Sequence, residues 1–222
     1  MLTDKMITLE NVWFSYEDEH YVLKNISLSI GEGVTVIKGP NGSGKTTLLK
    51  IASFLLKPKK GHVIVEGTSF WSASRSVREK LRKKVVYVHE KPYLFKGTVY
   101  DNIAYPLKIR GYDLSRVVDV AKEFGVGKIL NTNVNELSAG MRQLVALARA
   151  FVFKPKYVFL DEPLANLDDE NKSRIIRIIE KYAKKGIAIV VATHMNINFR
   201  KEIVSKIAFM NNGVIVKVSK YK

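Results

Sequence analysis

One segment, residues 39–46, limits the possible folds of this chain more than any other. It reads Gly-Pro-Asn-Gly-Ser-Gly-Lys-Thr and fits the spacing G-x-x-x-x-G-K-[ST]. An apolar stretch at residues 34–37 precedes it, and residues 45–56 have a helical pattern. A glycine-rich turn between a strand and a helix presents a concave row of backbone N–H groups at the positive end of the helix, where phosphate binds. This context favours a phosphate-binding loop over a glycine-rich turn without a ligand.

The residues of this loop predict the contacts of a nucleoside triphosphate. A side chain at Gly42 or Gly44 would obstruct the phosphates. Lys45 is expected to reach the β- and γ-phosphates, and Thr46 is expected to ligate Mg²⁺. The nucleotide-binding residues predicted from the loop are Asn41, Gly42, Ser43, Gly44, Lys45, Thr46 and Thr47.

Three continuous apolar runs, residues 85–88, 157–160 and 187–191, are typical of strands buried on both faces of a parallel sheet. Residues 7–14 and 22–30 instead alternate with a period of two, which predicts strands with one buried face. The sequence therefore predicts an α/β fold in which the first strands differ in kind from the later ones.

The clearest helical pattern covers residues 168–185, with Asp168 or Asp169 as the N-cap and Gly186 at its end. A hairpin is predicted for residues 206–218, because Asn-Asn-Gly lies in its middle.

Residues 92–140 contain no obvious strand, and residues 100–108 and 114–124 have the strongest helical patterns within them. This stretch is predicted to form a helical subdomain inserted into the α/β core.

Composition limits the compartment and the partners. No stretch of the 222 residues approaches the roughly 20 uninterrupted apolar residues of a membrane span. Residues 1–6 lack the apolar core of a signal peptide, so a cytoplasmic location is expected, and the absence of Cys is consistent with it. The net charge of +16 suits phosphate-bearing partners, although solvated lysine-rich helices would give it too. The lysines are spread along the chain and form no nucleic-acid tail.

Two strand ends carry ionisable residues. Asp161 and Glu162 follow the apolar run 157–160, and His194 follows the run 187–191. The carboxyl ends of strands in α/β sheets are where ligands bind. The alternatives are a solvated helix cap for the Asp-Glu pair and a structural role for the histidine.

Several segments resemble the characteristic motifs of ABC ATPases. Residues 137–141, Leu-Ser-Ala-Gly-Met, are similar to the signature motif, which is usually LSGGQ, and residues 142–150 are similar to the helix that follows it. Residues 157–163 look like the Walker B strand with its following Glu, and residues 164–168 look like the D-loop. Residues 191–194 look like the segment of the switch histidine, and residues 14–16 look like the aromatic A-loop. Their order runs along essentially the whole chain.

The resemblance implies a single ABC ATPase domain over residues 1–222. A P-loop NTPase core of mostly parallel strands, with an N-terminal antiparallel β subdomain, would comprise about residues 1–91 and 141–222. The inserted helical subdomain, with the signature motif, would comprise about residues 92–140.

The resemblance also implies roles in ATP hydrolysis. Glu162 would orient or deprotonate the attacking water, and His194 and Lys45 would contact the phosphates that react. Mg²⁺ would be held by Thr46 and Asp161.

Further contacts with ATP are implied outside these motifs. Tyr16 would stack on adenine, although an ordinary strand aromatic is the alternative. Ser138 would cap a helix, and with Gly140 it would face the phosphates of ATP held by a second chain.

The sequence departs from the family pattern at two places. Glu90 stands where the family usually has Gln, and it is predicted to ligate Mg²⁺, unless it points outward and pairs with a surface Lys such as Lys91. In the signature, Ala139 replaces Gly and Met141 replaces Gln. Ala139 would cost about 1 kcal/mol if its position required positive φ.

The function implied is that of an ATP-binding and ATP-hydrolysing subunit, with ATP and Mg²⁺ as cofactors, that powers solute transport. Its partners would be a second ATPase subunit, identical or related, and an integral membrane permease. The permease would hold it on the inner face of the cell membrane, and import is favoured over export. The alternative is a soluble ABC ATPase for iron–sulfur assembly or nucleic-acid work, but no nucleic-acid partner is expected. The signature motif argues against a P-loop kinase.

Overall fold

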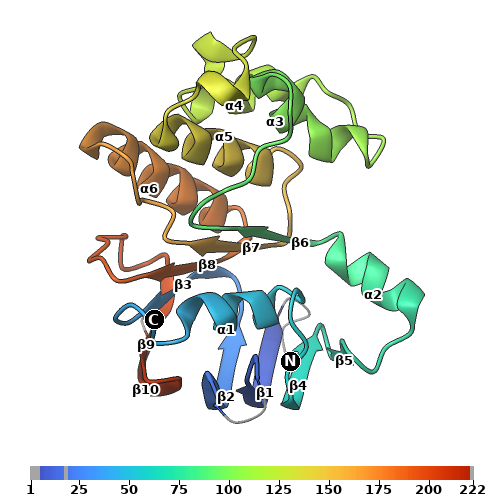
Figure 1. The fold of residues 1–222 in the computed structure, drawn as a ribbon, viewed down its shortest axis with the longest axis vertical. Helices are drawn as coiled ribbons and strands as arrows, with labels where there is room; N and C mark the ends of the chain where they lie inside the picture. Colours follow the sequence, from blue (N-terminus) through green and yellow to red (C-terminus); the bar gives the residue numbers. More distant parts are fainter. Residues whose placement is uncertain (1–5, 18–19, 221–222) are drawn as a thin grey trace.

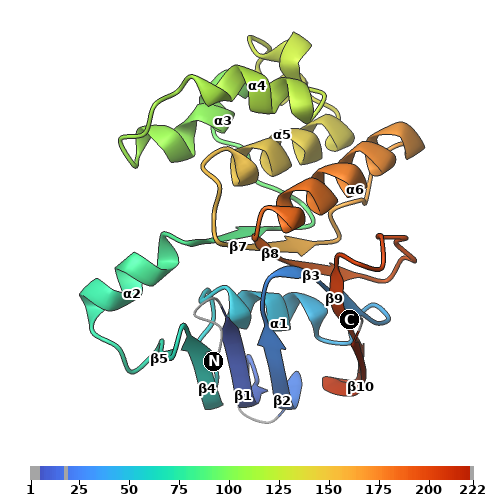
Figure 2. The same cartoon turned by 180° about the vertical axis from the view of Figure 1, so that it is seen from behind.

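The chain folds into two β-sheets of different character, with one helix packed between them (Figures 1 and 2). The computed structural model describes residues 6–17 and 20–220, so part of the N-terminal segment considered above, residues 1–5, lies outside the described residues. No helix within the described residues is both long and apolar enough to cross a membrane.

The larger sheet has six strands in the order β10-β9-β3-β8-β7-β6. Its strands are β3 (Gly33–Lys38), β6 (Val85–Val88), β7 (Tyr157–Asp161), β8 (Ala188–Thr193), β9 (Val204–Asn211) and β10 (Val214–Lys220). All neighbours are parallel except β9 and β10, which form the predicted hairpin. Every residue of β7 and β8 is buried, as the continuous apolar runs predicted.

The smaller sheet is antiparallel, in the order β2-β1-β4-β5. Its strands are β1 (Ile7–Phe14), β2 (Leu23–Ile30), β4 (Lys60–Val65) and β5 (Thr68–Ser69). Buried and open positions alternate along β2, which explains the period of two in its sequence. The predicted fold class, a mostly parallel core with an N-terminal antiparallel sheet and inserted helices, is confirmed.

Successive residues of the parallel strands face opposite sides. Val158 and Leu160 of β7 pack among the helices, whereas Tyr157 and Phe159 pack toward α1 (Lys45–Ala52) and the small sheet. Figure 1 shows α1 enclosed between the two sheets and the other large helices on the far face. Both faces of the parallel sheet are therefore covered, which a parallel sheet requires.

The helices on the far face are α3 (Val99–Lys108), α4 (Arg116–Glu123), α5 (Ala139–Phe151) and α6 (Asp169–Lys184), with short 3-10 turns at Gly127–Ile129 and Val134–Glu136. The Asp168 carboxylate accepts from the N–H of Asn171 at 2.8 Å, so Asp168 rather than Asp169 is the N-cap of α6. α3 and α4 lie within one or two residues of the predicted helices.

Two helices differ from expectation. α1 ends at Ala52 rather than residue 56, because Phe54 takes a left-handed backbone (φ 66°) and stacks on Phe70, 4.0 Å between ring centroids. α2 (Arg75–Arg82) was not predicted: it has Ser74 as N-cap but buries only Leu81, so it has no hydrophobic periodicity to detect.

One carboxylate connects the two sheets. Glu66 lies in the turn between β4 and β5, with φ 50°. Its oxygens accept from Lys84 Nζ at 2.6 Å, from Tyr157 Oη at 3.2 Å and from Lys156 Nζ. Lys84 immediately precedes β6 and Lys156 immediately precedes β7, so Glu66 fixes the small sheet against two strands of the large one.

We expect Glu66→Gln to lower the free energy of unfolding at pH 7 by about 1–2 kcal/mol, the contribution of hydrogen bonds to charged groups discounted for partial exposure. Urea unfolding measures the change. The matched control is Glu79→Gln, which breaks only the exposed pair between Glu79 and Arg75 and should cost less than about 0.5 kcal/mol.

The difference in unfolding free energy between the unaltered protein and the Glu66→Gln variant should also depend on pH. Burial alone would raise the pKa of the Glu66 carboxyl, but hydrogen bonds and charge from Lys156 and Lys84 lower that pKa below its ordinary value of 4.5. A lowered folded-state pKa gives stability that is present above the unfolded pKa and is lost as pH falls through the folded pKa. The stability advantage over the Gln variant should therefore shrink between about pH 5 and pH 3. A constant difference across this range would contradict the charge pairing.

Candidate active site

The carboxyl ends of β3 and β7 meet at a cavity of about 310 Å³. The glycine-rich loop follows β3, and the Asp-Glu pair ends β7. The lining residues are Val22, Asn41, Gly42, Ser43, Gly44, Lys45, Thr46, Thr47, Glu90, Asp161 and Glu162. The structure thus brings together the whole predicted loop and three predicted acidic residues.

The loop has the conformation and the free donors that a phosphate group requires. Gly44 has φ 98°, a backbone conformation that favours glycine, and an added Cβ would also lie 2.9 Å from Leu23 Cδ2. Gly42 has φ 78° but faces open space, so only its backbone demands glycine. The Ser43 hydroxyl is buried and has no hydrogen-bond partner in the described part of the chain. This orphaned group, at the N-terminus of α1, fits a phosphate oxygen.

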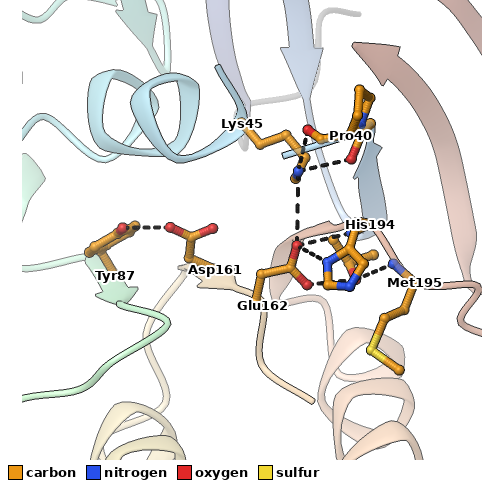
Figure 3. A network of polar contacts seen from close by, with 9 residues as sticks. Pro40, Lys45, Tyr87, Asp161, Glu162, His194 and Met195 are labelled. Carbon is orange, nitrogen blue, oxygen red and sulfur yellow. Dashed lines mark hydrogen bonds and ion pairs between the residues drawn. The ribbon is translucent and has the colours of Figure 1, made fainter. Parts of the chain in front are cut away.

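Lys45 is folded back onto its own loop. Its Nζ donates to Gly39 O at 2.9 Å and to Pro40 O at 3.0 Å, and it lies 3.9 Å from Glu162 Oε1 (Figure 3). Lys45 and Glu162 are both buried. The cation therefore sits beside the cavity, held by two carbonyls and one carboxylate.

Glu162 and His194, which were predicted from different strand ends, are in direct contact. Glu162 Oε1 accepts from the backbone N–H of His194 at 2.9 Å and lies 2.9 Å from His194 Nδ1. Glu162 Oε2 accepts from Thr193 Oγ1 at 2.9 Å. The backbone of Glu162 is left-handed (φ 45°), and its N–H donates to Ala192 O at 2.9 Å. The end of β8 thus fixes this carboxylate at the cavity wall.

Asp161 lies at the end of β7, on the side of Glu162 away from His194 (Figure 3), and is 1% exposed. Its Oδ2 accepts a hydrogen bond from Tyr87 Oη at 3.0 Å (Figure 3). Burial, and then the charge of Asp161, raises the pKa of Tyr87 above its ordinary value, so the phenol stays protonated and donates. Sequence reasoning missed Tyr87; its only signal was a hydroxyl in the otherwise aliphatic strand 85–88.

The donors at this position suit a hard cation. Asp161 and Glu90 offer carboxylate oxygens and Thr46 a hydroxyl, which are the ligand types that Mg²⁺ prefers. The described residues contain no group of three or more His, Cys, Asp or Glu side chains that could hold a metal without further ligands. Asp161, Glu90 and Thr46 are suited to hold Mg²⁺ by the chemistry of their oxygens.

Tyr16 lies at the edge of the same loop. Its hydroxyl is 3.2 Å from Thr47 Oγ1, and its ring meets the ring of Phe14 edge-on at 5.0 Å. The Tyr16 side chain is nevertheless 58% exposed. An aromatic face held beside the phosphate loop and open to solvent is suited to stacking.

The predicted signature residues do not line this cavity. Ser138 caps α5 as expected, since its Oγ accepts from the N–H of Met141 at 3.2 Å. Ala139 is the first residue of α5 and is not among the positive-φ residues of the described chain, so the expected backbone cost of this substitution does not arise. At Gly140 an added Cβ would lie 2.7 Å from Asn166 O, which explains the glycine.

Comparison with known proteins agrees with this geometry. Residues 23–165 match the model of the ABC transporter family. The chain is 38% identical to an ABC transporter ATP-binding protein of Pyrococcus furiosus, over 95% of this chain and 82% of the relative. It is 34% identical to the tungstate uptake system ATP-binding protein TupC of Peptoclostridium acidaminophilum, over 93% and 95%.

A solved structure of an ATP-binding cassette has the same fold as this chain. The fold superposes with a TM-score of 0.87 and 30% identity on the ATP-binding cassette MJ0796, a dimer in a post-hydrolysis state bound to ADP and phosphate, covering 97% of this chain and 99% of that one. A phosphate loop, an Asp-Glu pair and a histidine in the arrangement described above thus accompany a sequence match over most of the chain. The chain therefore belongs to the ABC transporter family, as an ATP-binding and ATP-hydrolysing subunit.

Proposed function

We propose that this chain powers solute movement through a separate membrane permease, and that a groove beside the nucleotide cavity receives a cytoplasmic segment of that permease. The groove is the observation that supports the proposal. It has a volume of about 420 Å³ and lies between β6 and the helices α3 and α5. Its lining residues are Val85, Val86, Tyr87, Val88, His89, Pro92, Tyr93, Phe95, Tyr105, Pro106, Ile109, Arg110, Ala146, Arg149, Ala150 and Phe153.

The groove is apolar and open. Tyr93 is 71% exposed and Ile109 is 61% exposed, and the rings of Phe95 and Tyr105 lie tilted against each other with centroids 4.5 Å apart. A contiguous exposed patch of this kind indicates a site of interaction with another protein. A short helix with apolar side chains would fill it.

Polar contacts of Arg149 and of the buried Asn102 hold one wall of the groove in place. Arg149 Nη2 donates to Tyr93 O at 2.6 Å, and Arg149 Nη1 lies 3.3 Å from Asn102 Oδ1. Asn102, which is fully buried, accepts from the N–H of Phe95 and donates to the carbonyls of Phe95 and Thr98. The aromatic wall is therefore formed before a partner arrives, which lowers the entropic cost of docking.

The groove and the ATP site are separate cavities, but one short segment of the chain lines both of them. The segment that follows β6 carries His89 into the groove and Glu90 into the nucleotide cavity. A partner in the groove can thus act on Glu90 through one residue of backbone. This arrangement favours a transport motor over a soluble iron–sulfur or nucleic-acid ATPase, and the uptake role of the relative TupC favours import.

Within the nucleotide site, bound ATP and Mg²⁺ would supply the scissile phosphate and the charge that offsets it. The loop residues 41–47 would hold the phosphates, Lys45 would leave the carbonyls of Gly39 and Pro40 for them, and Tyr16 would stack on adenine. Thr46, Asp161 and Glu90 would hold the metal.

Hydrolysis would depend on the Glu162–His194 pair. Glu162 would take the proton of the attacking water, and His194 would donate to the γ-phosphate as its charge spreads. Because Ser138 and Gly140 lie outside the cavity, they would face ATP bound by a second subunit, in a head-to-tail dimer of identical or related chains.

The groove is tested by Ile109→Glu, which puts a charge on its exposed rim. We expect the variant to fold and to hydrolyse ATP as before, but to lose most of its association with the permease, because a charge resists burial in an apolar contact. The measurement is the fraction of the tagged chain that is recovered with the membranes of its own cells rather than in the soluble fraction. The matched control, Val216→Glu on β10, changes an aliphatic side chain of equal exposure, 60%, outside the groove. Equal membrane recovery of both variants would contradict docking in the groove, and recovery of the unaltered chain only in the soluble fraction would contradict the transport role.

The catalytic role is tested by Glu162→Gln, which keeps the shape but removes the base. We expect ATP binding to persist and hydrolysis to fall by about 10²–10⁴-fold. A nucleotide-bound dimer should then accumulate, which size-exclusion chromatography with ATP and Mg²⁺ can detect. Normal hydrolysis by a monomeric variant would contradict both the role and the dimer.

The role of Glu90 is tested by Glu90→Gln. If the carboxylate ligates Mg²⁺, the variant should need more Mg²⁺ for half-maximal ATPase activity, while its affinity for metal-free ATP should be equal or higher, because a negative charge beside the phosphates is removed. Identical Mg²⁺ dependence would exclude Glu90 from the metal ligands.

A further inference from the structure

Tyr87 lies outside the recognised motifs but contacts Asp161, one of the carboxylates proposed to hold the metal. It is the third residue of β6, and its hydroxyl donates to Asp161 Oδ2 at 3.0 Å (Figure 3). The Asp161 side chain is almost completely buried, so a fixed donor there decides where its carboxylate points. No other hydrogen bond to the Asp161 carboxylate is found in the part of the chain that the structure describes.

The position of Tyr87 follows from the pairing of β6 with β7. The two strands are parallel, with Tyr87 opposite Phe159 and Val88 opposite Leu160. Tyr87 packs on the side of the sheet that faces α1, whereas Val86 and Val88 face the helices. The phenol therefore extends along the α1 face as far as the end of β7, where Asp161 lies.

We propose that Tyr87 is a positioning residue for the metal site: its hydroxyl holds one oxygen of Asp161 and leaves the other oxygen directed at the ion shared with ATP. A carboxylate ligand that is already oriented loses less conformational freedom when the ion binds. This role of Tyr87 rests on the proposed role of Asp161 as a metal ligand, but not on the permease or on the direction of transport.

The alternative is that Tyr87 only fills space against α1. The ring alone would then suffice, and phenylalanine would replace tyrosine without effect on the metal. The hydroxyl is what distinguishes the two possibilities, so a substitution that removes only the hydroxyl tests them.

The experiment compares Tyr87→Phe with the unaltered protein in binding a non-hydrolysable imido analogue of ATP. Calorimetry gives the affinity with excess chelator and then along a Mg²⁺ titration, and electron paramagnetic resonance of Mn²⁺ reports bound metal directly. We expect nucleotide affinity without metal to change less than about twofold, and the metal concentration for half-saturation to rise about tenfold, the lower end of the loss expected when a group that orients a metal ligand is removed.

The matched control is Tyr157→Phe. Tyr157 lies on the neighbouring strand β7, belongs to the core against which Tyr87 packs, and donates its hydroxyl to the Glu66 carboxylate at 3.2 Å, away from the cavity. We expect its metal dependence to match that of the unaltered protein. A shift of the same size in both variants would show a general effect on the core and overturn the proposal.

A double substitution tests whether Tyr87 acts through Asp161. In an Asp161→Asn background, Tyr87→Phe should add less than about twofold to the change in metal affinity, because coupled residues are not additive. A full additional effect would overturn the proposal. So would an unchanged metal titration for a folded Tyr87→Phe protein, or tighter metal binding, which would mean that the hydroxyl competes with the ion.

Discussion

The meeting of parallel strand ends at one edge of the large sheet is the constraint on which the rest of this structure depends. β3, β7 and β8 are neighbours or next neighbours, and all three run in the same direction. Their last residues therefore project into one region, although Lys38 and Thr193 are 155 positions apart in the sequence (193 − 38). Both faces of these strands are buried, so the charged side chains Lys38 and Asp161 stand where their strands end. The same burial that stabilises the sheet thus concentrates its chemistry at this edge.

The two buried charged side chains Lys45 and Glu162 differ in how firmly their partners hold them. Lys45 is held by carbonyls of its own loop and by a 3.9 Å approach to Glu162, contacts that an incoming phosphate can replace. Glu162 has additional donors in Thr193 and the backbone of His194. Its carboxylate therefore keeps two hydrogen bonds when Lys45 moves toward phosphate. The Lys45 cation can therefore change partners, whereas the Glu162 carboxylate stays fixed.

The features that local sequence could predict are those with local causes. The loop 39–46, the apolar runs and the Asp168 cap each depend on residues within a few positions of one another, and each is found where expected. Tyr87 and Glu66 act across pairings between distant segments, which no short window reveals. α1 ended early because of the Phe54–Phe70 stack, again a distant contact, and α2 depends on its cap and a single buried leucine. At Ala139 the family pattern suggested a strained backbone, but the residue begins a regular helix turn that alanine favours.

β6 gives a physical reason why the groove and the ATP site can respond together. Its side chains alternate, with Val86 and Val88 toward the helices that form the groove and Tyr87 toward Asp161. On its outer side β6 has no strand neighbour among the described residues, so only β7 restrains it within the sheet. A displacement of β6 by a docked partner would therefore move Tyr87 and the following Glu90 in the same step. Because one short edge strand and the two residues after it carry these side chains, no longer chain of contacts is required to link docking to the proposed metal site.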